Sequence, residues 1–454
     1  MSTDFRPLHP CTAPIFRQDH ETETWFYAPG YLVLTGTGHA DALEARLKSG
    51  TPDSPAAVEL VRRGAIALRE RNGTGPRPFT PLCLTLYLNN TCNLACRYCY
   101  SEPDGKASQR LEMDMIQTAT ELVAKNCTAR HRRMTVVFHG GGEPSLEQGR
   151  LEQALELVEQ ATQAHSVDLF RYIATNGVMP AERAAGLARR FDLIGLSCDG
   201  PEAIQSQQRP LRGGQSSTPW AESTARLIHQ AGKPLHIRVT ITPTSLHRQS
   251  EIAAYICEQL QPQEIHVEPV YQAGLAKAED CFEPGQAEDF VREFLRAREI
   301  ASRYGVRWMS SGNRPAEIHG PYCHVFRDVL NLIPGGEATA CFRISHTEEL
   351  HQKGLSIGSF DPRARQYILE QDQIEHLRRM LNRQPEKCAA CFNQFHCTRG
   401  CPDQCLVADR DVHRGEFRCR VNMLLAQSAL EECAAALRSL RTSPEQVIGR
   451  AITA

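Results

Sequence analysis

The 454-residue chain has almost no charge imbalance and lacks any long apolar run. A formal net charge of −2 gives no electrostatic basis for binding nucleic acid or an anionic membrane. The N-terminus shows no apolar signal region, and no run approaches the roughly 18 residues of a membrane-spanning helix. Residues 423–437 come closest, but Glu431 and Glu432 interrupt them. We therefore expect a cytoplasmic protein without nucleic-acid or membrane partners.

Cysteine, in contrast, is abundant, with 18 residues in the chain. Apolar residues make up 41% and charged residues 23% of the sequence, which is typical of a globular protein with two or three domains at this length. In a reducing cytosol so many cysteines would not form a disulfide framework, so metal or cluster ligation is the expectation. Three of them share one short loop, and eight more lie between residues 323 and 419.

The short loop places Cys92, Cys96 and Cys99 in a CxxxCxxC pattern after an apolar run, 82–88, that predicts a strand. Three thiolates can ligate three irons of a [4Fe–4S] cube and leave the fourth iron without a protein ligand. A zinc knuckle would need a fourth Cys or His nearby, and the ten residues after Cys99 contain none. The pattern resembles the signature of the radical S-adenosylmethionine (SAM) superfamily. In that family the open iron chelates SAM, and an electron from the cluster releases a 5′-deoxyadenosyl radical.

The middle of the chain alternates short apolar runs with helical stretches, which favours a parallel sheet built from βα units. This pattern resembles the partial (β/α)6 TIM-like barrel of radical SAM enzymes, an α/β fold. Parallel barrels form their sites at the carboxyl ends of the strands. Strands are predicted at 82–88, 134–138, 169–174, 193–197, 236–241 and 264–270, and helices at 113–125, 146–163, 181–189, 221–230 and 250–260.

Unusual residues follow the predicted strands. Within the segment 138–144, Gly141, Gly142 and Glu143 match the family's GGE motif, which implies that Glu143 meets the SAM ammonium. The segment 197–200 resembles an S-x-D-G motif, and a downstream Arg suits a carboxylate because its planar fork donates two parallel hydrogen bonds. For Arg238 and Glu268, both on predicted late strands, we expect one of two arrangements. Either both face the same pocket, or they form a salt bridge in the barrel. The resemblance implies SAM contacts from Tyr98, Gly141, Gly142, Glu143, Ser197, Asp199 and Arg209.

Cys388, Cys391, Cys397 and Cys401 form a CxxC-x5-C-x3-C string, which follows Cys323, Gly336 and Cys341 and precedes Cys419. This order resembles the SPASM domain of radical SAM maturases, which carries two auxiliary [4Fe–4S] clusters; zinc is the alternative. The resemblance implies Cys323, Cys341 and Cys401 as ligands of the first cluster, and Cys388, Cys391, Cys397 and Cys419 as ligands of the second. The first set lacks a fourth ligand. Candidates are His324, Cys405 and Cys281, or an open iron that binds a substrate atom.

We expect four regions. Residues 1–70 form a small α+β segment, 80–305 the radical SAM core, 315–425 the SPASM domain and 426–454 a C-terminal helix. Strands at 15–17, 24–27 and 31–34 followed by helices at 40–48 and 54–63 resemble the leader-peptide recognition element of ribosomal-peptide maturases, which captures a precursor at a sheet edge. An extension that packs on the barrel is the alternative.

The resemblance implies a radical SAM oxidoreductase that acts on a peptide or protein side chain. We expect an intramolecular C–C, C–O or C–S crosslink in a ribosomally made precursor peptide, with SAM, three [4Fe–4S] clusters and an external donor such as flavodoxin or ferredoxin. A sulfatase-maturing enzyme is the alternative, although relatives of that type place an Asp directly after the cysteine that Cys341 matches, and this chain has Phe342. Epimerisation is a third outcome, and an electron-transfer or zinc protein belongs to another class. The sequence assigns no catalytic residue.

Overall fold

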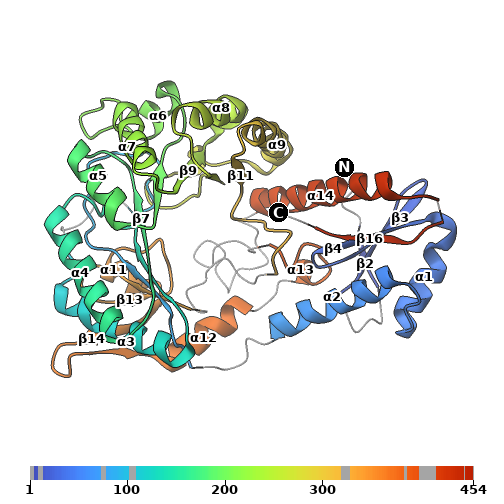
Figure 1. Ribbon diagram of the computed structural model, residues 1–454, viewed down its shortest axis with the longest axis horizontal. Coiled ribbons are helices and arrows are strands. Elements are labelled where there is room, and N and C mark those ends of the chain that lie inside the picture. Colours follow the sequence, from blue (N-terminus) through green and yellow to red (C-terminus); the bar gives the residue numbers. More distant parts are fainter. Residues whose placement is uncertain are drawn as a thin grey trace.

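The computed structural model describes residues 5–8, 14–72, 78–101, 109–318, 328–382, 386–397, 416–443 and 445–452. Within these residues, no helix combines the length and the apolar character needed to cross a bilayer. The chain folds into two sheets with separate helical layers, and Figure 1 shows the larger sheet on the left and the smaller one on the right.

The larger sheet has 11 strands, of which the first six along the chain correspond to the six predicted strands. They are β5 (Cys83–Leu86), β6 (Met134–Phe138), β7 (Leu169–Thr175), β8 (Leu193–Ser197), β9 (Leu235–Ile241) and β10 (Glu264–Pro269). All six run parallel, so the predicted parallel α/β sheet is confirmed.

Five further strands extend this sheet at both ends. They are β11 (Arg307–Met309), β12 (Val329–Leu332), β13 (Ala338–Thr339), β14 (Ser356–Asp361) and β15 (Gln366–Leu369). The strand order is β11-β10-β9-β8-β7-β6-β5-β12-β13-β14-β15. Because β12 pairs in parallel with β5, the cysteine-rich last third continues the sheet directly beside the strand that leads into the cysteine loop.

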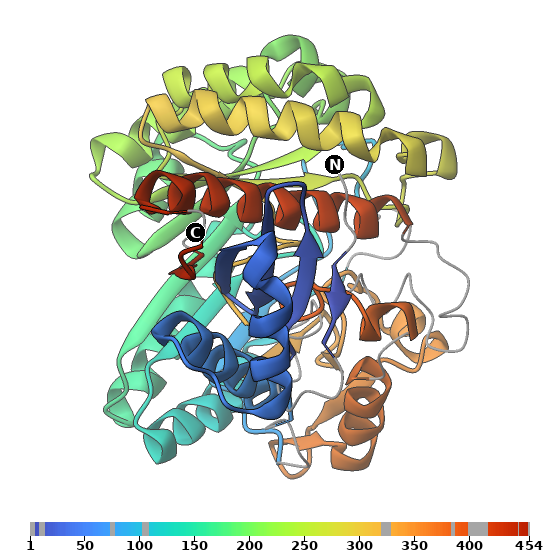
Figure 2. The ribbon, with the colours of Figure 1, turned by 90° about the vertical axis from the view of Figure 1, so that its right-hand side faces the viewer.

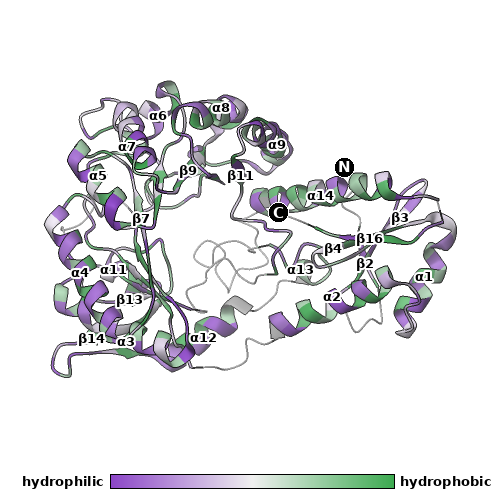
Figure 3. Ribbon diagram, viewed as in Figure 1, coloured by the Kyte–Doolittle hydropathy of each residue, from purple (hydrophilic) through white to green (hydrophobic). Residues whose placement is uncertain are grey.

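Helices cover the outer side of the parallel strands (Figure 1). Along β9, Ile237, Val239 and Ile241 are buried in the core, whereas His236, Arg238 and Thr240 alternate with them on the inner face. This alternation leaves a polar inner face and an apolar outer face, and Figure 3 shows the hydrophobic strands behind hydrophilic helix surfaces. The helices are α3 (Met113–Arg130), α4 (Gln148–Ala164), α5 (Ala181–Arg190), α6 (Glu202–Gln208), α7 (Thr218–Gln230), α8 (Gln249–Gln259) and α9 (Ala287–Arg303).

The smaller sheet combines both ends of the chain. Its antiparallel strands are β1 (Arg6–Pro7), β2 (Phe16–Asp19), β3 (Glu23–Ala28), β4 (Tyr31–Gly36) and, at the far edge, β16 (Ile448–Ala451). The helices that pack with it are α1 (Thr37–Ser49), α2 (Pro55–Asn72) and α14 (Glu416–Leu440). Three strands and two helices of the predicted N-terminal segment are therefore present, but the C-terminal strand was not predicted.

Two separate apolar clusters hold this smaller sheet between its helices. On one face Trp25 and Leu34 pack with Leu430 of α14. On the other face Phe26 and Val33 pack with residues of α1 and α2. Figure 2 shows α14 lying across the blue strands and alongside α9, and contacts between α14 and α9 join the two sheets. The remaining elements are α11 (Thr347–Gln352), α12 (Gln371–Asn382), α13 (Glu386–Ala389), η1 (Pro243–Arg248), η2 (Ala278–Asp280) and η3 (Pro284–Gln286).

Candidate functional site

The cysteine loop 92–99 follows β5 at the carboxyl end of the parallel strands and is fixed to a distant segment by backbone hydrogen bonds. The amide of Ala95 donates to the carbonyl of Pro210 at 2.9 Å, and the amide of Arg97 donates to the carbonyl of Gln208 at 3.1 Å. The loop therefore has a defined conformation that the chain around α6 imposes.

The sulfur environment suits an iron–sulfur cluster. Cys92 Sγ accepts from the amide of Leu94 at 3.5 Å and from Asn176 Nδ2 at 3.6 Å. Burial raises the pKa of the Cys92 and Cys96 thiols to about 11, so bound cations are needed to hold both as thiolates at neutral pH. In the described part of the chain the three sulfurs do not gather within 4.8 Å, whereas the ligand atoms of one tetrahedral zinc lie closer together. The donor set fits a cube better than a single ion.

The glycines of the GGE segment bring the end of β6 against the chain that leads into the cysteine loop. A Cβ at Gly142 would lie 1.8 Å from the carbonyl oxygen of Thr91, and one at Gly141 would lie 2.5 Å from that of Asn89. Gly141 also has a φ of +68°, which favours glycine. For these two residues, the close approach that glycine permits is thus an approach to the protein backbone.

Glu143 is buried, and its carboxylate accepts four hydrogen bonds. Oε1 accepts from the amide and hydroxyl of Ser145 at 3.1 and 2.6 Å and from Thr175 Oγ1 at 2.7 Å. Oε2 accepts from the amide of Asn176 at 2.7 Å. Since a carboxylate oxygen offers two lone pairs, Oε2 retains acceptor capacity for an ammonium group. The same carboxylate therefore joins two strand ends and can meet a ligand.

Tyr98 and Asp199 form the centre of a buried network. Tyr98 donates its hydroxyl proton to Asp199 Oδ2 at 2.5 Å, and Gln208 Nε2 donates to the same oxygen at 2.7 Å. Asp199 Oδ1 accepts from the amide of Thr240 at 3.0 Å. Asp199 is fully buried, so its carboxylate positions Tyr98 and the segment that follows α6.

Arg209 completes this network and has donor capacity to spare. Its Nη1 donates to the Tyr98 hydroxyl oxygen at 2.8 Å, while its Nε is buried and has no hydrogen-bond partner among the described residues. Burial opposes its charge, but Cys96 and Tyr98 raise the pKa of Arg209 well above its ordinary value. A buried cation with an unpaired donor beside the cysteine loop fits a carboxylate ligand. Ser197, half-buried at the end of β8, lies in register with Arg238 of β9.

His139, at the end of β6, is a site residue that the sequence did not single out. Arg238 Nη1 lies 2.9 Å from His139 Nε2, which makes that nitrogen an acceptor and the imidazole neutral. Burial and the neighbouring Arg238 lower the pKa of His139 to about 3. Glu268, predicted on the same face, forms an ion pair with Arg418 of α14 at 3.4 Å.

Asn176 and Gln208 were also missed as site residues. Asn176 contacts both Cys92 and Glu143, and Gln208 bonds Asp199 and the carbonyl of Thr240. Asn176 directly follows β7 and lies two residues beyond the strand predicted at 169–174, so its place at a strand end was the available signal.

Four cysteines of the last third lie near one another. Burial raises the pKa of the Cys391 thiol to about 12, and the negative charges of Cys397, Cys419 and Cys388 add to that increase. Asn422 Nδ2 donates to Cys397 Sγ at 3.3 Å. The set predicted for the second auxiliary cluster is thereby brought together at the start of α14.

The set predicted for the first auxiliary cluster is only partly described. Cys341 is buried beside Tyr87 and Ile344. Cys281 is half-buried and donates its thiol proton to the carbonyl of Lys277 at 3.3 Å. Cys323, Cys401, His324 and Cys405 lie outside the described residues. No disulfide joins any of the described cysteines.

Comparison with known proteins shows which family the region around the cysteine loop resembles. Residues 86–253 match the family model of the radical SAM superfamily. The chain is 24% identical over 336 residues to the serine-type anaerobic sulfatase-maturating enzyme of Klebsiella aerogenes, covering 68% of this chain and 77% of that protein. It is 26% identical over 331 residues to mycofactocin maturase MftC of Mycolicibacterium smegmatis (strain ATCC 700084 / mc(2)155), covering 71% and 78%. The structure of native anSMEcpe with bound AdoMet and Cp18Cys peptide superposes with a TM-score of 0.63 at 16% identity, covering 79% of this chain and 99% of the other.

The chain therefore carries a radical SAM domain, built on the mostly parallel α/β sheet described above. With maturases among its relatives, it is a radical SAM enzyme that acts on peptides or proteins.

Proposed function

We propose that this enzyme installs an intramolecular C–C, C–O or C–S crosslink in a ribosomally synthesised peptide. The observation that carries the proposal is the presence of two separate cysteine sites in one chain. Cys92, Cys96 and Cys99 follow β5, and the gathered set around Cys391 lies at the start of α14. The structure of native anSMEcpe, which has a similar fold and holds the Cp18Cys peptide, supports a peptide substrate.

Different residues around the cysteine loop bind different groups of SAM. Cys92, Cys96 and Cys99 hold the first cluster, which, with SAM bound, supplies the 5′-deoxyadenosyl radical. Glu143 accepts the SAM ammonium through its Oε2, and Arg209 receives the carboxylate. Gly141, Gly142, Tyr98 and Asp199 fix the loops that carry these groups, and Ser197 meets the ribose.

The cysteines of the last third hold the two auxiliary clusters. Cys323, Cys341 and Cys401 serve the first, and Cys388, Cys391, Cys397 and Cys419 the second. Closing a crosslink removes two hydrogens from the peptide. The radical takes one hydrogen atom, and the second leaves as a proton and an electron. Held by these cysteines, an auxiliary cluster would supply an acceptor for that electron, and an external flavodoxin- or ferredoxin-type donor would supply the electron needed to cleave SAM.

Formylglycine formation is the second candidate, because a sulfatase-maturating enzyme is among the relatives. The residue after Cys341 argues against it, since Phe342 provides no carboxylate base. In the structure the carbonyl oxygen of Phe342 accepts from the hydroxyl of Tyr87, so the segment serves packing.

Co-expression with short peptides encoded beside the gene, followed by mass spectrometry, tests the proposal. We expect one peptide to lose two hydrogens without becoming reactive toward a hydrazide probe. A hydrazide-reactive product would indicate formylglycine instead, and an unchanged mass with altered stereochemistry would indicate epimerisation. Iron analysis should give about twelve irons per chain for three cubane clusters.

Peptide docking at the smaller sheet is part of the same proposal. The edge of β4 is paired with the chain's own β16, in register from Leu34 and Ile448 to Tyr31 and Ala451. At the other edge β1 contains Pro7, which has no amide proton to donate. A precursor that adds a strand beside β4 must therefore displace β16.

A further inference from the structure

A second group of ligand-type side chains lies far from the cysteine loop, on the inner face of the barrel. His236 is the second residue of β9, and Glu264 and His266 are the first and third residues of β10. The parallel register pairs Glu264 with His236. The strand end at Pro269 lies five residues beyond Glu264, a distance of about 16 Å. The group therefore sits toward the amino ends of the strands, opposite the SAM-facing loops.

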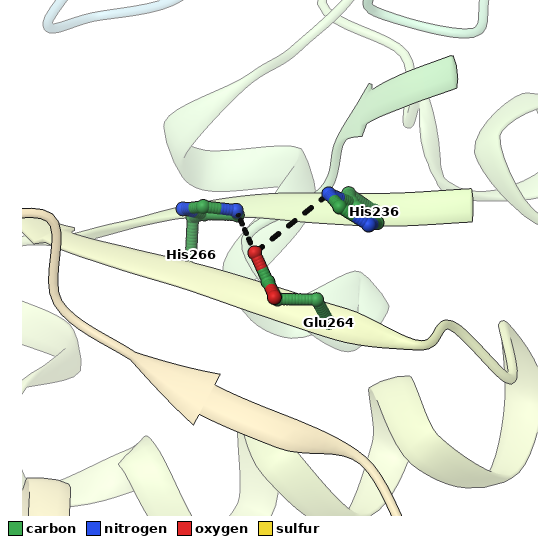
Figure 4. A group of neighbouring side chains, drawn as sticks. All are labelled: His236, Glu264 and His266. Atoms are coloured by element: carbon green, nitrogen blue, oxygen red, sulfur yellow. Dashed lines mark ion pairs between the residues drawn. The ribbon is translucent and has the colours of Figure 1, made fainter. Parts of the chain in front are cut away.

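The three side chains converge on one carboxylate oxygen. Figure 4 shows the two imidazole rings on either side of Glu264, with both dashed lines meeting at the same atom. His236 Nδ1 lies 3.8 Å from Glu264 Oε1, and His266 Nε2 contacts that oxygen. All three ligand atoms lie within 4.8 Å of one another. Ligand atoms around a tetrahedral zinc with bonds of about 2.0–2.1 Å are separated by roughly 3.4 Å, so small side-chain rotations complete the geometry.

The protonation state of the group also suits a cation. Burial lowers the pKa of both His236 and His266, although Glu264 opposes the shift, so both imidazoles are neutral at pH 7 and keep a lone pair. Glu264 is buried and ion-pairs with Arg307 through Oε2, which leaves Oε1 to face the histidines. The ion pair between Arg307 and Oε2 thus fixes the orientation of the Glu264 carboxylate.

Glu268, on the same face, is already bonded to Ser311 and Arg418. Its Oε1 accepts from the amide of Ser311 at 2.9 Å, and its Oε2 pairs with Arg418 at 3.4 Å. The available donor set is therefore two imidazole nitrogens and one carboxylate oxygen. This set is one that proteins use for zinc while leaving a coordination position open.

We propose that His236, Glu264 and His266 bind a divalent transition-metal ion of the zinc type, with an open position for water or a substrate donor. This site is separate from the cysteine clusters and does not depend on which peptide modification the enzyme performs. The histidines remain 22% and 27% exposed, so solvent reaches the ion.

Zinc titration of the anaerobically reconstituted full chain tests the proposal. We expect the wild type to bind about one more zinc than the His236→Gln/His266→Gln double variant, with X-ray absorption showing N/O ligands near 2.0 Å for that ion rather than sulfur near 2.3 Å. His351→Gln is the matched control, because His351 lies 3.6 Å from Glu337 but belongs to no group of three ligand-type side chains within the described residues; this variant should bind as much zinc as the wild type.

Equal zinc content in the wild type and the double variant, or sulfur-only coordination of all bound zinc, would overturn the site. Unchanged iron content reports that the double variant is folded. If it is not, Glu264→Gln replaces it, and we expect zinc affinity to fall at least about tenfold in a chelator competition. Unchanged affinity in Glu264→Gln would equally refute the proposal.

Discussion

Replacing Gly142 with alanine should disable SAM cleavage through the backbone alone. The added Cβ would lie 1.8 Å from the carbonyl oxygen of Thr91, where ordinary contacts begin at 3.4 Å, and the obstructing atom belongs to the backbone rather than to a flexible side chain. One of the two segments must move by more than an ångström. Because Thr91 directly precedes Cys92, this movement displaces the first cluster ligand.

The expected loss in the rate of SAM cleavage follows from this displacement. Overpacking of this kind costs about 1–3 kcal/mol, and a 1 Å misplacement of a reacting group costs about a hundredfold in rate. We expect Gly142→Ala to form 5′-deoxyadenosine at about one hundredth of the wild-type rate, measured by chromatography after reductive activation. Gly149→Ala is the control, because nothing lies within 4 Å of its added Cβ, in α4. Wild-type iron content and turnover in Gly142→Ala would refute the reasoning.

Three further changes test other parts of the structure. Arg209→Lys loses the planar fork and its bond to Tyr98, so SAM should bind at least about tenfold more weakly by calorimetry, and unchanged affinity would contradict its role. Glu44→Gln should lower stability at pH 7. Hydrogen bonds from Arg6 hold the pKa of Glu44 at about 2, so its contribution is present above the ordinary value of 4.5 and is lost as the pH falls toward 2; a pH-independent difference in urea unfolding would count against it. Deleting 446–454 removes β16, so a fluorescent precursor peptide that docks beside β4 should bind more tightly, and weaker or equal binding would exclude that edge.

The parallel part of the fold was predictable because its signal is local. Runs such as 134–138 and 193–197 are short, apolar and separated by helical stretches, and the structure gives strands with those bounds. β16 was not predictable, because Ile448–Ala451 has no strong strand pattern. It is a strand because β4 offers an edge, and that edge is known only from the folded chain.

The candidate site likewise contains residues that the sequence predicts and residues that only the folded chain brings together. The loop cysteines and Glu143 are recognisable because their spacing is fixed along the sequence. The role of Asp199 as a partner of Tyr98 and Thr240 depends on three segments meeting, which no local pattern reports. His236 and His266 looked like ordinary strand residues, and only the register of β9 with β10 places them around one carboxylate.

The central claim is that three cysteine sulfurs hold a cluster whose remaining iron binds SAM. Electron paramagnetic resonance of the reduced full chain, recorded with and without SAM, tests it most directly. We expect SAM to change the cluster signal in the wild type, and the Cys92→Ala/Cys96→Ala/Cys99→Ala variant to lack that SAM-responsive signal. A wild-type spectrum that SAM leaves unchanged, or a variant that still responds to SAM, would contradict the account.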